Sequence, residues 1–403
     1  MVNIAVLGYG TVGSGVVEVI NTNGTRINQR VGDEIAVKYV LDLRDFPEDP
    51  IQEKIVHDYD VILSDPEVKI VVEVMGGIEP AYTFVKSALL AGKSVATSNK
   101  ALVAKHGAEL LSIAQEKNIN FLFEASVGGG IPIIRPLNTS LTADEIEEIT
   151  GILNGTTNYM MTKMFYEGAD YDTVLKEAQD NGYAERNPEA DVEGYDACRK
   201  IAILASLISG QQVDFEDIYC EGITKITTED MDYARAMDMT IKLLAICKRD
   251  GDHLHAIVAP YLLGKEHPLY NVNDVFNAIF VHGNVLGDAM FYGSGAGKLP
   301  TASAVVADVV DEAKHLHENM PNEWNDQPLP LADPDQVSGR FFVRVQTTDL
   351  SLIRSVFGTI EQIQVPKAEG ETGFVTAQMT LGQYKAKAAE IKAEILSMIR
   401  IKD

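Results

Sequence analysis

The sequence predicts an α/β protein with an N-terminal doubly wound parallel sheet, an α+β middle part and a small C-terminal βαββαβ unit. Short β-branched runs alternate with helical patterns in the first third of the chain, which is typical of strand–helix–strand repeats. A segment with four prolines, between residues 321 and 334, precedes the last strand and helix patterns. These observations predict the following regions: 1–137 completed by 300–318, then 138–299, a linker at 319–338, and 339–403.

The first strand pattern, at residues 3–7, leads directly into a glycine-rich turn. Gly8-x-Gly10-x-x-Gly13 then precedes a helical pattern, which is the context of a Rossmann dinucleotide-binding fingerprint. The first glycine permits the sharp bend, the second lets the backbone approach a pyrophosphate, and the third packs helix on strand. We therefore predict that NAD or NADP binds at Gly8, Gly10, Thr11, Val12 and Gly13. A tight turn that binds no nucleotide is the alternative.

The second strand pattern, at residues 35–41, ends in Asp42-Leu43-Arg44. At this position an acidic residue binds the ribose hydroxyls of NAD, whereas an arginine pairs with the 2′-phosphate of NADP. Asp42 and Arg44 favour opposite cofactors, so the residues leave the choice open. We count Arg44 among the cofactor-binding residues and expect a slight preference for NADP, with NAD also used.

Two further strand patterns end at the edge where open α/β sheets bind their ligands. The run 70–75 ends in Gly76-Gly77, and the run 94–97 ends in Ser98-Asn99-Lys100. We expect Gly76, Ser98 and Lys100 to lie at the nicotinamide side of the cofactor. For Lys100, a solvated loop position is an equally good interpretation of the sequence.

A run of three glycines, at residues 128–130, follows the strand pattern that begins at Phe121. Glycines have no side chain to cover the backbone carbonyls there, and the Glu124 carboxylate lies close in sequence. Oxygen donors of this kind suit a hard cation. A glycine-rich turn without a metal is the alternative.

The stretch from Gly182 to Lys200 concentrates acidic residues between two helical patterns, and Asp172 is expected to cap the first of these helices. The second helix continues as the apolar run 201–208, which predicts that it is buried. Asp196 and Lys200 are four residues apart and would share one helix face. One interpretation is a salt bridge at a helix start. The other is a polar pocket in which the acidic residues bind a cationic ligand while Lys200 moves a proton.

Composition excludes several classes of function. A net charge of −25 argues against nucleic-acid binding, which needs a basic face. No apolar run approaches the roughly 20 residues that a membrane span requires. The three scattered cysteines suggest a reducing compartment, and the eight dispersed histidines lack the spacing of a metal site. We expect a soluble cytoplasmic protein that binds neither nucleic acid nor membranes.

The remaining patterns concern the last third of the chain. A glycine-rich loop at 287–301 precedes an expected helix at 302–317 and could close over the cofactor. Beyond the linker, the pattern predicts strand, helix, strand, strand, helix and strand at 341–345, 350–357, 360–365, 374–381, 384–398 and 399–401.

Together these motifs resemble the homoserine dehydrogenase family over almost the whole chain. The most specific part is the spaced acid–lysine pattern Asp191-x-x-Gly194-x-Asp196-x-x-x-Lys200. The other matching segments are the Gly8–Gly13 fingerprint, Glu73-Val74-Met75-Gly76-Gly77, Asn99-Lys100, Glu124 to Pro132, Gly151 to Thr156, Ala178-x-x-x-Gly182-Tyr183-Ala184-Glu185 and Pro300-Thr301-Ala302. The C-terminal unit looks like a shortened ACT domain.

The resemblance implies an enzyme that interconverts L-homoserine and L-aspartate 4-semialdehyde with NAD(P), in the aspartate pathway to threonine and methionine, and acts as a homodimer or homotetramer. Lys200 would donate and accept the proton, and Lys100 would lie at the reacting carbon. Glu185 and Asp196 would hold the amino acid, and Asp191 would support Lys200. The resemblance also implies a sodium site at Glu124 and the carbonyls of Val127, Gly129 and Ile131, and cofactor contacts at Gly182, Gly295 and Gly297.

The chain departs from the family at Asn187 and Ser294, where the family often has aspartate and proline, and in its ACT-like turn. The family's ligand turn contains Pro-Gly, whereas Leu350-Ser351 follows Asp349 here. We therefore expect threonine to inhibit weakly or not at all.

Two other functions are compatible with parts of the sequence. A nucleotide- or amino-acid-sensing protein without turnover would bind the cofactor but would need neither Lys100 nor Lys200. A phosphorylating dehydrogenase acting on aspartate semialdehyde would need a catalytic cysteine, and Cys198 has no histidine near it in sequence.

Overall fold

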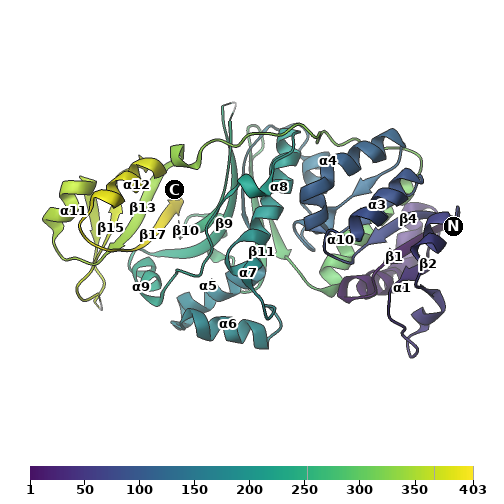
Figure 1. Ribbon diagram of the computed structural model, residues 1–403, viewed down its shortest axis with the longest axis horizontal. Helices are drawn as coiled ribbons and strands as arrows, with labels where there is room; N and C mark the ends of the chain where they lie inside the picture. Colours follow the sequence, from purple (N-terminus) through teal and green to yellow (C-terminus); the bar gives the residue numbers. More distant parts are fainter. Residues whose placement is uncertain (252, 367, 403) are drawn as a thin grey trace. The chain divides into compact units, whose positions relative to one another are not determined.

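The computed structural model describes residues 1–251, 253–366 and 368–402, and within them the chain forms two compact units (Figure 1). The first unit contains residues 1–144, 202–215 and 293–329. The second contains residues 145–201, 216–292 and the described residues from 330 onward. The chain therefore crosses between the units more than once, and the segment predicted as a domain of its own, 339–403, belongs to the second unit.

The first unit has a six-stranded parallel sheet, counted over the described chain, in the order β3-β2-β1-β4-β5-β6. Its strands are β1 (Val2–Leu7), β2 (Ile35–Leu41), β3 (Ile55–Val56), β4 (Val68–Glu73), β5 (Ser94–Thr97) and β6 (Phe121–Leu122). Its main helices are α1 (Thr11–Val31), α2 (Tyr59–Ser64), α3 (Ala81–Leu90), α4 (Lys100–Glu116) and α10 (Lys298–Lys314). The strand order reverses beside β1, so the predicted doubly wound sheet is confirmed.

Helix α10 completes the core of the first unit by packing against α1 (Figure 1). Gly15 of α1 permits this close approach, because a Cβ there would lie 2.8 Å from the Lys298 carbonyl oxygen and 3.0 Å from the Ala302 Cβ. The helix begins four residues before the predicted start at Ala302 and ends at Lys314. A helix from this distant segment therefore belongs to the first unit.

The second unit has an eleven-stranded sheet among the described residues, along the path β12-β11-β7-β9-β10-β17-β13-β15-β14 with β16 beside β13 and β8 beside β10. Its strands are β7 (Ile146–Ile152), β8 (Tyr219–Cys220), β9 (Met239–Asp250), β10 (His253–Gly264), β11 (Phe276–Gly283), β12 (Gly287–Ser294), β13 (Ser338–Val345), β14 (Ile360–Ile363), β15 (Thr372–Thr376), β16 (Met379–Thr380) and β17 (Ile395–Lys402). The predicted glycine loop at 287–301 is wrong in its first half, because residues 287–294 pair as β12.

The helices of this unit are α5 (Gly155–Glu167), α6 (Tyr171–Asp180), α7 (Glu189–Val192), α9 (Thr228–Ala236), α11 (Leu350–Phe357) and α12 (Leu381–Glu390). Helix α8 (Tyr195–Ser209) begins in this unit, and its residues from 202 onward belong to the first unit. The expected cap of α6 is wrong by two residues: the Asp170 side chain accepts from the Thr173 N–H at 2.9 Å, and Asp172 lies inside the first turn. The expected helix 384–398 is also wrong at its end, because α12 ends at Glu390 and residues 395–402 form β17, which pairs with β13 through residues 395–401. No helix in the described ranges is both long and apolar enough to cross a membrane.

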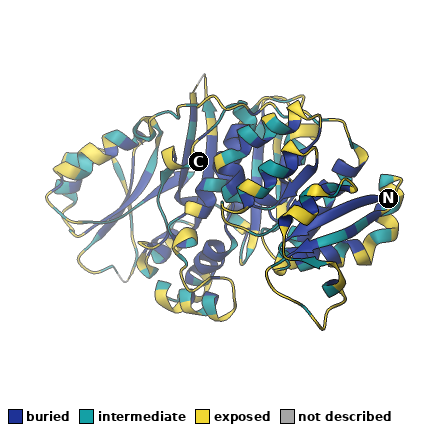
Figure 2. Cartoon of the chain, turned by 45° about the vertical axis from the view of Figure 1, so that its right-hand side comes forward, coloured by how far each residue is buried: buried dark blue, intermediate teal, exposed yellow. Residues whose placement is uncertain are grey.

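The C-terminal elements follow the predicted βαββαβ order and form the strand path β17-β13-β15-β14. They do not form a separate sheet, because β17 runs parallel to β10 with Tyr261 opposite Arg400 and Leu263 opposite Lys402. Figure 2 shows the strands of this sheet as largely buried. Buried Arg344 of β13 links the C-terminal strands to α9 through its ion pair with Asp230 at 2.9 Å, and it also pairs with Glu371, just before β15, at 3.0 Å.

Candidate active site

The glycine turn after β1 has the geometry that a phosphate-binding turn requires. Gly8 has a φ of +97°, which favours glycine, and a Cβ at Gly13 would lie only 1.9 Å from the Gly8 carbonyl oxygen. At Gly10, by contrast, a Cβ would meet no atom within 4 Å among the described residues. Gly10 caps α1 without a side-chain hydrogen bond, and Thr11 and Val12 open the helix. The helix N-terminus therefore presents backbone N–H groups to open space, as anion-binding helix starts do.

Asp42 and Arg44, the residues expected to choose the cofactor, form an ion pair with each other. The Arg44 Nε and Nη2 donate to the two Asp42 carboxylate oxygens, each at 2.9 Å. The Tyr9 N–H also donates to Asp42, at 2.8 Å. The Arg44 hydrogen bonds hold the pKa of Asp42 well below its usual range. The Asp42 carboxylate therefore already accepts hydrogen bonds from Arg44 and from the Tyr9 N–H, whereas the Arg44 side chain is 61% exposed.

A buried carboxylate that the sequence reasoning did not name as a site residue, Glu73, organises the ends of β4 and β5. Its Oε1 accepts from the Met75 N–H at 2.8 Å and its Oε2 accepts from the Thr97 hydroxyl at 2.6 Å. Burial raises the pKa of Glu73. The contact with Gly76 N–H is longer, 3.4 Å. Glu73 therefore fixes the glycine loop that the sequence predicted to lie beside the cofactor.

The Asn99 side chain fixes the start of α4 and ties it to the glycine loop after β4. The Asn99 side chain accepts from the Leu102 N–H at 3.1 Å and donates to the Gly77 carbonyl at 2.5 Å. Lys100 is therefore the first residue of α4, half-buried, and Ser98 precedes the cap. The structure brings Gly76, Ser98 and Lys100 to one edge of the first unit's sheet, as their strand ends predicted.

In the second unit, the acid–lysine pattern forms a buried hydrogen-bonded cluster. Lys200 Nζ donates to the Leu153 carbonyl at 2.7 Å and forms an ion pair with Asp196 at 2.8 Å, with side-chain exposures of 10% and 5%. Asn154 Nδ2 donates to Asp191 at 2.8 Å and to Asp196 at 3.0 Å. We call Asn154, Asp191, Asp196 and Lys200 the lysine cluster.

Local structure explains why these side chains meet. Asp196 and Lys200 lie one turn apart on α8, and Leu153 and Asn154 directly follow β7. Asn154 also caps α5, since its Oδ1 accepts from the Thr157 N–H at 2.9 Å. The sequence reasoning missed Asn154 as a site residue, although its position between a strand and a helix start was a capping signal.

Glu185 and Gly182 lie in an exposed loop between α6 and α7. The Glu185 backbone carbonyl accepts from the Gln179 side chain at 3.1 Å, and none of the cluster hydrogen bonds described above involves the Glu185 carboxylate. Gly182 has a φ of +74°. The Thr156 hydroxyl anchors the loop by donating to the Tyr183 carbonyl at 2.6 Å.

The Glu124 carboxylate, expected to bind a cation, is buried and accepts from backbone N–H groups. Its Oε1 accepts from Ile133 at 2.6 Å and from Ile134 at 2.9 Å, and its Oε2 accepts from Arg135 at 2.6 Å. A carboxylate has about four acceptor positions, so one is left for a further partner. The described residues contain no group of at least three His, Cys, Asp or Glu side chains placed to hold a metal ion. A sodium site here would therefore depend on the carbonyls of Val127, Gly129 and Ile131.

Two glycine-rich segments predicted separately are neighbours in the first unit. A Cβ at Gly129 would lie 2.3 Å from the Gly295 carbonyl oxygen, and the Gly130 N–H donates to the Ser294 carbonyl at 3.1 Å. Gly297, with a φ of +116°, then caps α10. Glycine at 129 is thus required for the two loops to touch.

Comparison with known proteins agrees with this arrangement. Residues 8–124 match the family model of the homoserine dehydrogenase NAD-binding domain, and residues 132–310 match that of homoserine dehydrogenase. The chain belongs to the homoserine dehydrogenase family. Members of this family are NAD(P)-dependent oxidoreductases that act on the CH–OH group of homoserine. The alternative of a sensor without turnover is not favoured.

Individual members of the homoserine dehydrogenase family match most or all of the chain. The Bacillus subtilis enzyme is 42% identical, covering 88% of this chain and 84% of its own length, and the Synechocystis enzyme is 40% identical over 99% of both. A crystal structure of homoserine dehydrogenase from Thiobacillus denitrificans covers 100% of this chain and 98% of its own, with a TM-score of 0.92 at 34% identity. A hyperthermophilic archaeal homoserine dehydrogenase mutant in complex with NADPH covers 77% and 97%, with a TM-score of 0.67 at 30% identity.

The geometry also disfavours a cysteine mechanism. Cys198 is buried, and its hydrogen bond with Cys220, together with burial, raises the pKa of its thiol. A nucleophilic cysteine needs the opposite shift.

Proposed function

We propose that this chain catalyses the NAD(P)-dependent interconversion of L-homoserine and L-aspartate 4-semialdehyde, with Lys200 as the proton donor and acceptor. The lysine cluster carries the proposal. It places a buried lysine beside the Asp196 carboxylate, with Asp191 joined to Asp196 through Asn154, where an amino-acid ammonium group and a reacting hydroxyl can be held together.

The oxidation of homoserine requires that the hydroxyl proton leave as hydride leaves the same carbon. The bound NAD(P) supplies the hydride acceptor. Lys200, as the neutral amine, accepts the proton, and in the reverse reaction its ammonium returns the proton to the developing alkoxide. Leu153 and Asp196 hold Nζ at 2.7 and 2.8 Å, so the nitrogen is positioned before substrate arrives.

The carboxylates serve two purposes in this proposal. Asp196, together with Glu185, binds the substrate ammonium, and Asp191 supports the cluster through Asn154. Glu185 is exposed, which suits a residue that meets the substrate at the entrance of the site. Lys100 would act at the reacting carbon.

We further propose NADP as the preferred cofactor, with NAD also used. Arg44 is the more exposed member of its ion pair, and Asp42 is already engaged by Arg44 and the Tyr9 N–H. Gly182, Gly295 and Gly297 would add backbone contacts to the cofactor.

A sodium ion at Glu124 would be structural, with Val127, Gly129 and Ile131 supplying carbonyl oxygens. A homodimer or homotetramer in the cytoplasm completes the proposal, and light scattering tests the assembly.

The decisive experiment is a spectrophotometric assay with L-homoserine, run separately with NAD and NADP, on the native protein and Lys200→Ala. We expect turnover to fall by roughly 10³-fold or more while NADPH binding, followed by fluorescence, stays near native. Lys176→Ala, at an exposed lysine of α6, is the matched control and should keep full activity. Undiminished turnover of Lys200→Ala would show that another group moves the proton.

A further inference from the structure

The second unit has a pocket of about 520 Å³ whose wall is unusually basic for this chain. The protein has a net charge of −25, yet among the described residues this pocket is lined by five basic side chains and one acidic one, Asp250. The basic residues are Lys248, Arg249, Arg340, Arg400 and Lys402. We call this site the cationic pocket. Its lining includes no member of the lysine cluster, so it is a separate site.

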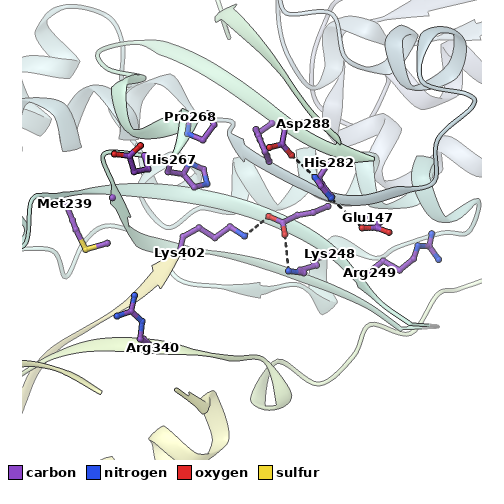
Figure 3. A pocket seen from close by; sticks show the side chains of 14 residues that line it. Glu147, Met239, Lys248, Arg249, His267, Pro268, His282, Asp288, Arg340 and Lys402 are labelled. Atoms are coloured by element: carbon purple, nitrogen blue, oxygen red, sulfur yellow. Dashed lines mark hydrogen bonds and ion pairs between the residues drawn. The ribbon is translucent and has the colours of Figure 1, made fainter. Parts of the chain in front are cut away.

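Strand register explains the concentration of charge. Arg400 and Lys402 are two residues apart on β17 and therefore project from the same sheet face. On the neighbouring strands, Lys248 of β9 stands opposite His255 of β10. Figure 3 shows the adjoining pocket, which shares Lys248, Arg249, Arg340 and Lys402 with the cationic pocket.

Three of the basic side chains form ion pairs with carboxylates. Glu148 is shared by Lys402, at 2.6 Å, and Lys248, at 3.2 Å, as the dashed lines in Figure 3 show. Arg400 Nη1 pairs with Glu221 at 2.7 Å.

Two buried nitrogen atoms in the wall lack hydrogen-bond partners within the described residues. They are Nη2 of Arg400 and Nδ1 of His255. Arg400 is only 5% exposed, so water does not readily compensate its unpaired N–H group. A buried donor without an acceptor is destabilising, and an anion that accepted from Arg400 would remove that cost.

The rest of the wall is apolar. It includes Ile246, Ile257, Tyr261, Phe341 and Leu381. We propose that the cationic pocket binds a small amphipathic anion, with a phosphate or carboxylate head on Arg400 and a compact apolar body against these side chains. A pocket of about 520 Å³ matches the size of sites for such molecules, roughly 300–1,000 Å³.

Titration calorimetry of the full chain with phenyl phosphate tests this proposal, with benzoate as the carboxylate probe and phenol as the uncharged probe. We expect at least one of the two anions to bind saturably, once per chain, and phenol to bind at least about tenfold more weakly. Arg400→Gln should weaken binding of that anion about tenfold or more, because it removes a charged donor. Lys402→Met should also weaken it, because it removes a cation and leaves the Glu148 charge less compensated.

Matched controls separate this site from other anion sites. Lys176→Met makes the same charge change on α6, outside the pocket, and Arg44→Gln removes a cation from the nucleotide-binding unit. Both should leave binding unchanged. If Arg400→Gln does not fold, as judged by circular dichroism, Lys402→Met decides. The proposal is overturned if neither anion binds, if phenol binds as well as the anions, if Arg44→Gln abolishes binding, or if folded pocket variants bind like the native protein.

Discussion

Substitution of Asn154 tests the lysine cluster directly, because this side chain has two separable roles. Its Oδ1 caps α5 by accepting from the Thr157 N–H at 2.9 Å. Its Nδ2 donates to Asp191 at 2.8 Å and to Asp196 at 3.0 Å. Serine retains a capping oxygen but has no amide to bridge the carboxylates, so Asn154→Ser removes the second role alone. Asn154→Ala removes both.

The hydrogen bonds that each variant loses determine the expected loss in kcat/KM and in stability. A hydrogen bond to a charged group contributes about 1.5–3 kcal/mol net, which corresponds to roughly 10- to 150-fold in kcat/KM if the bond holds Asp196 in its working position. Losing the cap costs about 1 kcal/mol of stability. We therefore expect Asn154→Ser to lose roughly 10- to 150-fold in kcat/KM for homoserine. Asn154→Ala should lose a similar amount and be about 1 kcal/mol less stable than the serine variant.

Initial rates with homoserine and NADP measure the first effect, and urea unfolding followed by circular dichroism measures the second. Cofactor affinity should stay native in both variants, since the hydrogen bonds lost lie in the lysine cluster. A serine variant with native kcat/KM would show that the amide does not position the carboxylates. An alanine variant as stable as the serine variant would refute the cap.

Three further predictions follow from other contacts. Arg44→Gln should weaken NADP binding about tenfold or more and leave NAD binding nearly unchanged, because only NADP carries the 2′-phosphate; equal losses would point to Asp42 instead. Burial lowers the pKa of Lys242 to about 7 from 10.5, so the unfolded chain binds more protons between these values and stability rises with pH. Urea unfolding at pH 7.5 to 9.5 should show the native protein gaining up to about 1.4 kcal/mol per pH unit over Lys242→Met, whereas a constant difference would contradict this. Millimolar L-threonine should inhibit weakly or not at all, because the turn after Asp349 lacks Pro-Gly and Asp349 itself accepts from the Ser351 and Leu352 N–H groups at 2.9 and 3.1 Å; cooperative inhibition in the standard assay would refute this.

The parts of the fold that sequence predicted well are those where local chemistry allows a single solution. Gly13 is an example, because any Cβ there meets the Gly8 carbonyl at 1.9 Å. Asp196 and Lys200 are another, because helix geometry alone brings residues four apart together. By contrast, β9 and β11 were missed. Residues 240–247 of β9 are buried continuously, so the strand lacks the polar alternation that marks a half-exposed strand.

The candidate site residues could be chosen from the sequence by residue type and spacing, but their hydrogen-bond partners could not. Asp42 and Arg44 appeared as competing cofactor ligands, yet they bind each other, which depends on side-chain positions that no sequence pattern records. Likewise, Glu124 appeared as a metal ligand, and the structure shows it accepting from the backbone of residues 133–135. Long-range pairing of this kind follows from tertiary packing and cannot be obtained from local periodicity.

The parallel pairing of β17 with β10 has a consequence for the order in which the chain is made. Roughly 130 residues separate the two strands, so at about 5–20 residues per second the ribosome takes about 7–26 seconds to deliver the partner of Tyr261, Leu262 and Leu263. During that interval this part of β10 is an open strand edge in the middle of what will become the sheet. Open edges recruit other chains. Once they are made, the C-terminal βαββαβ elements close this edge through β17, a role that would preserve them even in a chain that no amino acid regulates.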